Sequence, residues 1–196
     1  AMDAPQNILQ AIKDSKLDVV LTLMAKFRDD PKSMVVAVKG LVNMVVDPSC
    51  ATLMIKSESL RTLFVCLLKH TNDEPIQEHG LWVLLNLCAK GGGSAKEALV
   101  KAGVLQVVCG ACEAHKGSLA VITKGSALLS NLAPLGPLHF VEKCNGVNLV
   151  KELLSGHSSD ASVAFSCCAC LWNVGIKAGV AKVAIQNAND LHSLLK

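Results

Sequence analysis

Four asparagines recur at nearly equal intervals along the chain, and each stands in a similar apolar frame. They are Asn43, Asn86, Asn131 and Asn173, separated by 43, 45 and 42 residues. A leucine stands two positions before each of them, as Leu41, Leu84, Leu129 and Leu171. Repeats of this length are typical of stacked supersecondary units that bury their apolar faces against one another. The spacing therefore predicts a repeat array whose function is recognition along a surface.

Apolar residues at helical spacing, with very few strand signals, predict an all-α fold. Tyrosine is absent from the 196 residues and phenylalanine occurs four times, whereas strands favour aromatic and β-branched residues in alternation. Leucine and valine instead recur three or four positions apart, which places them on one face of a helix. The clearest runs are Leu17–Phe27, Leu60–Leu67, Val104–Ala111 and Val147–Leu154.

The polar breaks after these runs have the chemistry of helix starts. Asp30–Pro31 and Asp73–Pro75 each place an aspartate cap before a proline in the first helical turn. Ser158–Asp160 supplies similar side-chain acceptors before the last long helix. At Gly91–Gly93 the glycines are expected to end one helix, and the Ser-x-x-Glu of Ser94–Glu97 is expected to open the next with a capping box.

Together these signals divide the chain into units of a short, a middle and a long helix. We place four units at residues 5–46, 48–89, 94–133 and 138–176, and a partial fifth at 179–196. All of them form a single domain over residues 3–196, because Ala1 before Met2 is interpreted as a tag residue. Since the sequence stops inside the fifth unit, we expect a segment of a longer array or an end that another subunit covers.

The units resemble armadillo repeats, the three-helix units of about 42 residues found in importin-alpha and beta-catenin. The matching features are the Leu-x-Asn of each third helix, the glycines that open two middle helices, and a small residue six positions before each asparagine. These small residues are Ala37, Gly80, Gly125 and Cys167, and the opening glycines are Gly103 and Gly146. HEAT repeats are the nearest alternative, but they have two helices and lack the asparagine. The resemblance covers the chain after Asp3 and implies a right-handed α-solenoid.

The resemblance also implies a protein-interaction module, in which an extended segment of a partner lies in a groove lined by the third helices. The four asparagines would then hold the backbone of that segment. An amide offers two donor hydrogens and two acceptor lone pairs, so it can hold the N–H and C=O of one peptide unit together. The alternative is structural, with each amide bridging neighbouring helices.

Tryptophans four residues before each asparagine would mark an importin-alpha-like cargo site, one helical turn away on the same face. The four positions are occupied by Lys39, Trp82, Ala127 and Ala169, so only Trp82 fits. Trp172 lies directly before Asn173, about 100° around the helix, and we expect it to pack between repeats. The sequence therefore does not favour a nuclear-import cargo as the ligand.

Charges near the same face favour an acidic or neutral peptide. Lys39, His79, Lys124 and Lys177 stand against Glu78 and Asp47. The predicted groove residues are Lys39, Asn43, His79, Trp82, Asn86, Lys124, Asn131 and Asn173. For any single lysine, a solvated helix face without a ligand is the alternative.

Other classes of function receive little support from the residues. A net charge of +3 with scattered lysines and arginines gives no argument for nucleic acid, and no run approaches the roughly 18 apolar residues that span a bilayer. Cys109-x-x-Cys112 with His115 has metal-like spacing but lacks a second pair to complete a tetrahedral site. We therefore expect no metal, no cofactor, no catalytic residues and no enzyme activity.

The nine cysteines, without a secretory signal, are interpreted as reduced thiols used as small core residues. We expect a cytoplasmic location, with the nucleus left open. A second hypothesis for function is a scaffold or assembly segment, which associates through its convex face or through its open last repeat. Self-association through that C-terminal repeat is one form of this hypothesis.

Overall fold

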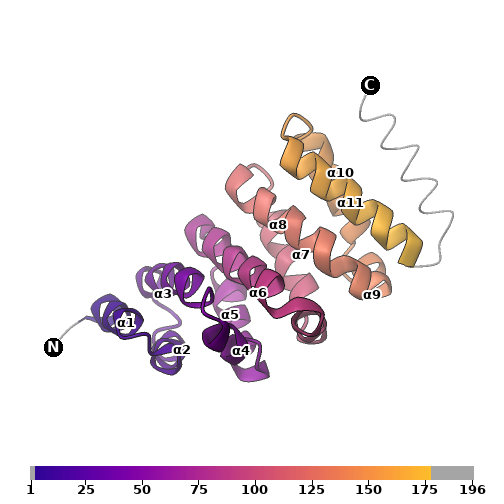
Figure 1. The fold of residues 1–196 in the computed structure, drawn as a ribbon. Helices are drawn as coiled ribbons and strands as arrows, with labels where there is room; N and C mark the ends of the chain where they lie inside the picture. The colour runs from indigo at the N-terminus through magenta and orange to yellow at the C-terminus, as the bar shows by residue number, and fades with distance from the viewer. Residues whose placement is uncertain (1–2, 178–196) are drawn as a thin grey trace. The chain divides into compact units, whose positions relative to one another are not determined.

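The computed structural model describes residues 3–177, and every regular element in that range is a helix (Figure 1). The predicted all-α fold is confirmed. The predicted partial repeat at 179–196 lies outside the described residues. Two compact units divide between Ala102 and Gly103, inside the third predicted repeat. The solenoid and the number of repeats stay predictions.

The first unit contains six described helices built around α3. They are α1 (Ala4–Lys13), α2 (Leu17–Lys26), α3 (Pro31–Met44), α4 (Pro48–Met54), α5 (Ser57–Lys69) and α6 (Glu74–Lys101). Helix α3 packs against α1 on one side and α6 on the other, and α2 packs against α5. Two sets of short, middle and long helices therefore follow one another, in the order that the sequence predicts for residues 5–46 and 48–89.

The second unit repeats this arrangement around α8 and α11. Its described elements are α7 (Val104–Ala114), α8 (Leu119–Leu132), the 3₁₀ turn η1 (Ala133–Leu135), α9 (Pro137–Glu142), α10 (Gly146–Gly156) and α11 (Ala161–Lys177). Helix α8 packs against α7 and α11, and α11 also packs against α10. The long helices thus form a packed pair in this unit, as α3 and α6 do in the first.

Aspartate caps start the long helices at the positions that the sequence indicates. The carboxylate of Asp30 accepts the backbone N–H groups of Lys32 and Ser33 at 3.3 and 3.2 Å. Asp73 accepts the N–H of Ile76 at 3.1 Å, and Asp160 accepts that of Val163 at 2.9 Å. Each cap satisfies N–H groups that have no partner inside the helix, and this fixes where the long helix begins.

The glycine run interrupts α6 at a single residue. Gly92 has φ 63° and ψ −154°, while the residues on both sides are helical. This conformation is almost restricted to glycine. The break agrees with the predicted helix end, but the predicted capping box does not form in this way, because Ser94 Oγ donates to the carbonyl of Gly91 at 3.4 Å.

The leucines two positions before the asparagines are core residues. Leu41, Leu84 and Leu129 are fully buried, and Leu171 is 1% exposed. Because this position points into the core, the asparagine two residues later is rotated about 200° away around the helix. The repeated leucine therefore fixes which face of each long helix carries the asparagine.

Candidate functional site

In the first unit, the predicted residues gather on the packed pair of α3 and α6. Lys39 and Asn43 lie one turn apart on α3, and both are exposed. Trp82 and Asn86 have the same spacing on α6, with Trp82 43% exposed and Asn86 half-buried. Because α3 packs against α6, two equivalent pairs come from adjacent helices. We call these four residues the α3–α6 face.

Asn86 also connects the two helices. Its Nδ2 atom donates to the carbonyl oxygen of Val42, the residue before Asn43, at 3.1 Å. No other hydrogen bond of Asn86 is found within residues 3–177. One amide hydrogen is therefore used between helices, and the amide oxygen keeps its capacity to accept a hydrogen bond. The bond to Val42 matches the structural alternative for Asn86, and its ligand-binding role stays a prediction.

The ring of His79 lies beside Trp82. Their ring centroids are 6.3 Å apart with an interplanar angle of 36°, and His79 Nδ1 lies 2.8 Å from the carbonyl oxygen of Pro75. A carbonyl can only accept, so Nδ1 carries the hydrogen in this arrangement. The bond holds the imidazole against the indole, so Trp82 is oriented while part of its surface stays accessible.

In the second unit, the predicted residues lie on α8 and α11. Asn131 is exposed and its Nδ2 donates to Ala127 of the same helix at 2.8 Å, whereas Asn173 is exposed on α11. Lys124 is half-buried, and its Nζ donates to the carbonyl of Ala120 at 3.1 Å. The structure therefore brings Lys39, Asn43, His79, Trp82 and Asn86 together in one unit, and Lys124, Asn131 and Asn173 in the other.

Trp172, which was expected to pack between repeats, is 62% exposed. The predicted repeat that would follow its helix, at 179–196, lies outside the described residues. Phe165 and Ile176, on the same helix, are 76% and 57% exposed. Steps of seven and four residues bring all three to one face of α11. We call them the α11 apolar face.

A pair of inter-repeat hydrogen bonds from histidines was not predicted. His70 Nε2 lies 2.9 Å from the carbonyl oxygen of Arg28, and His157 Nε2 lies 2.6 Å from that of Lys116. Both histidines follow the end of a middle helix, α5 or α10. Each stands 16 residues before an asparagine, as does His115. The shared spacing is the signal that would have identified them.

Ion pairs accompany both histidine bonds. Lys69 binds Asp29, and its hydrogen bond lowers the pKa of that carboxyl below its ordinary value. Lys116 binds Glu113 and Glu152 at 2.7 and 2.5 Å, and these hydrogen bonds raise the pKa of the lysine. All of these charges are well exposed, so solvent screens the pairs and each contributes little stability.

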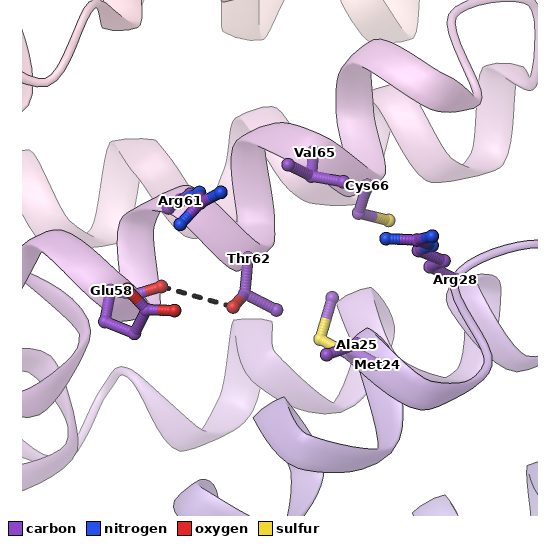
Figure 2. Close-up of a pocket in the computed structure, with 8 residues that line it drawn as sticks. All are labelled: Met24, Ala25, Arg28, Glu58, Arg61, Thr62, Val65 and Cys66. Carbon is purple, nitrogen blue, oxygen red and sulfur yellow. Dashed lines mark hydrogen bonds between the residues drawn. The ribbon is translucent and has the colours of Figure 1, made fainter.

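Grooves between consecutive middle helices were also not predicted from the sequence. In the first unit a groove of about 240 Å³ lies between α2 and α5 (Figure 2). Met24 and Ala25, with Arg28 just beyond α2, form one wall, and α5 forms the other with Glu58, Arg61, Thr62, Val65 and Cys66.

In the second unit a groove of about 330 Å³ lies between α7 and the start of α10. Since their linings differ in residue type, no repeated motif indicates them.

The described residues contain no cluster suited to a metal ion, and the Cys109-x-x-Cys112 motif is part of the buried interior. No group of three His, Cys, Asp or Glu side chains within residues 3–177 is placed to hold a metal. Cys109 and Cys112 are 6% and 0% exposed. Among the same residues, no helix is long and apolar enough to cross a membrane.

No protein-family model matches the chain, and no curated protein matches it. The armadillo-repeat resemblance therefore stays a prediction that rests on the residues themselves.

Proposed function

We propose that the α3–α6 face binds an extended segment of a partner protein. The observation that carries this proposal is the position of Trp82. This residue stands one helical turn before Asn86, is 43% exposed, and lies beside the ring of His79. A large aromatic side chain with an accessible surface is a common anchor in protein interfaces. The free amide oxygen of Asn86 would accept a backbone N–H of the bound segment.

Asn43 provides a second amide at the equivalent position of α3. Because it is exposed, both its donors and its acceptors are accessible to a ligand. Lys39, one turn earlier, adds a positive charge and favours an acidic or neutral segment over a basic one. The face on α8 and α11, with Asn131 and Asn173, would act in the same way with less aromatic surface.

The test compares variants of the full chain in binding to acidic, neutral and basic extended peptides, measured by fluorescence anisotropy. The double variant Asn43→Ala/Trp82→Ala is expected to weaken binding about tenfold or more, a loss of about 1.4 kcal/mol. Asn72→Ala is a matched control, because Asn72 is exposed in the turn between α5 and α6. Unchanged affinity of the double variant, or equal loss in the control, would refute the proposal.

A second candidate function is assembly through the α11 apolar face. Phe165, Trp172 and Ile176 expose large apolar surfaces on a helix whose one charged residue is Lys177. In a two-fold interface the same patch of both subunits is used, so a face with few charges brings few like charges together. Sedimentation at increasing concentration tests this. We expect a dimer that Trp172→Glu dissociates, whereas a monomer at all concentrations rejects self-association.

A further inference from the structure

The second unit concentrates thiol groups around α7. Five cysteines come from α7, from the turn before α10, and from the buried side of α11: Cys109, Cys112, Cys144, Cys167 and Cys170. Four of these are buried, and Cys144 is half-buried. Because an oxidant must reach its first thiol from solvent, Cys144 is the accessible member of this group.

Cys144 shares a groove with one of the buried thiols. Cys109 and Cys144 both line the groove between α7 and the start of α10. Among the four buried cysteines of this group, Cys109 is the one that lines the groove. Cys109 is therefore the thiol in position to react with Cys144.

The turn that carries Cys144 is fixed by its neighbours. The N–H of Cys144 donates to the carbonyl of His139 at 3.3 Å, and Asn145 has φ 48°. At Gly146, a Cβ atom would lie 2.2 Å from the buried ring of Phe140. A side chain there would displace the ring, so the glycine sets the path of the turn. The turn thereby keeps Cys144 beside α7.

The groove is open beside Cys144, so an oxidant needs to bring only one sulfur atom to that thiol. Its volume is about 330 Å³, and Gln106, Gly110 and Leu149 contribute to its lining. At Gly110 no heavy atom lies within 4 Å of the position that a Cβ would take. Cys144 is therefore reached from the open side of the groove, whereas Cys109 is buried and reacts in the second step.

We propose that Cys109 and Cys144 are an oxidative modification site, at which a low-molecular-weight disulfide such as glutathione disulfide converts the two thiols into a protein disulfide. The Cys144 thiolate attacks one sulfur of the oxidant, whose S–S bond breaks and releases one glutathione thiolate. The Cys109 thiolate then attacks the Cys144 sulfur and displaces the second glutathione. The protein loses two electrons and two protons, and both end on the two glutathione thiols.

The reaction has a defined pH dependence. Burial raises the pKa of the Cys144 thiol, and it raises that of Cys109 further. Since the thiolate is the attacking species, the rate should rise with pH through and above the ordinary cysteine pKa of about 8.5. The product joins α7 to the turn between α9 and α10 and closes the groove on that side.

The experiment exposes the full chain to mixtures of oxidised and reduced glutathione, followed by acid quenching, alkylation and peptide mapping by mass spectrometry. The wild-type protein should lose two hydrogen atoms and yield a Cys109–Cys144 linked peptide. Cys109→Ser should stop at a mixed disulfide, with glutathione attached to Cys144. Cys144→Ser should form a protein disulfide at least about tenfold more slowly. Cys168→Ser, which changes another half-buried cysteine, should behave like the wild type.

A linked peptide that joins another pair overturns the proposal, and so does a Cys109→Ser variant that forms a protein disulfide at the wild-type rate. Circular dichroism establishes that each variant is folded. A second measurement on the unsubstituted protein does not depend on the variants. With isotope-coded alkylation before and after oxidation, Cys109 and Cys144 must lose reactivity in parallel, and separate loss also rejects the pair.

Discussion

His70 donates a hydrogen bond from Nε2 to the carbonyl oxygen of Arg28, 42 residues earlier, across 2.9 Å. That carbonyl belongs to the turn just beyond the end of α2, so it has no partner in the helix. The bond between His157 and Lys116 spans 41 residues and has the same position in the second unit. Each histidine thus connects one middle helix to the end of the middle helix before it.

We predict that His70→Ala and His157→Ala each destabilise the protein by about 1 kcal/mol, because each removes a hydrogen bond to a carbonyl in the turn after a middle helix. Urea unfolding followed by circular dichroism measures the change. His139→Ala is the control, because this histidine is exposed on α9. Equal midpoints for all three variants and the wild type would show that the histidine bonds contribute no stability.

The asparagines should differ in their contribution to stability. Asn86→Ala should cost about 0.5–1.5 kcal/mol, since it removes the hydrogen bond to Val42. Asn43→Ala should be nearly neutral, because Asn43 is exposed at the equivalent position. Thermal unfolding of the two single variants tests this. A larger loss of stability from Asn43→Ala than from Asn86→Ala would mean that Asn43, and not Asn86, is the structural asparagine.

Truncation of the repeated leucines should be far more costly. Leu84→Ala and Leu129→Ala each remove a fully buried side chain and should destabilise the protein by about 2–5 kcal/mol. Leu68→Ala is a matched control, because Leu68 is 58% exposed. The comparison uses the midpoints of denaturant unfolding, provided that the slope of unfolding free energy against denaturant concentration is the same for each variant. If Leu68→Ala costs as much as Leu84→Ala, the assignment of the core is wrong.

Stability should also fall in acid through the aspartate caps. The hydrogen bond from Ser33 is the largest cause that lowers the pKa of Asp30, and the one from Ser49 does the same for Asp47. A carboxyl with a lowered folded-state pKa stabilises the fold above its unfolded pKa of about 3.9, and this contribution is lost as pH falls below it.

The variant Asp30→Asn tests this linkage, because it keeps a capping oxygen and removes the titrating group. Its urea midpoint should decrease less than that of the wild type between about pH 6 and pH 3. Parallel decreases in the two proteins would mean that Asp30 does not contribute to the acid sensitivity.

Periodic features of the sequence predicted the all-α fold. The leucine two positions before each asparagine marked a core position, and Asp30, Asp73 and Asp160 marked the starts of long helices. The sequence left bridging between helices as an alternative for the asparagines, but it did not identify Val42 as the acceptor of Asn86, because a backbone acceptor on another helix leaves no residue-type signal.

The backbone conformation of Gly92 is one that a D-amino acid adopts more readily than an L-amino acid. Its φ of 63° and ψ of −154° mirror the extended polyproline-like backbone that ordinary L-residues adopt. No heavy atom lies within 4 Å of the Cβ that an L-residue would place there, so the obstacle to L-alanine is its own backbone. A D-alanine introduced by chemical ligation would adopt these angles without strain and would also restrict the unfolded chain, so the mirror-image amino acid should be the stabilising one at this break in α6.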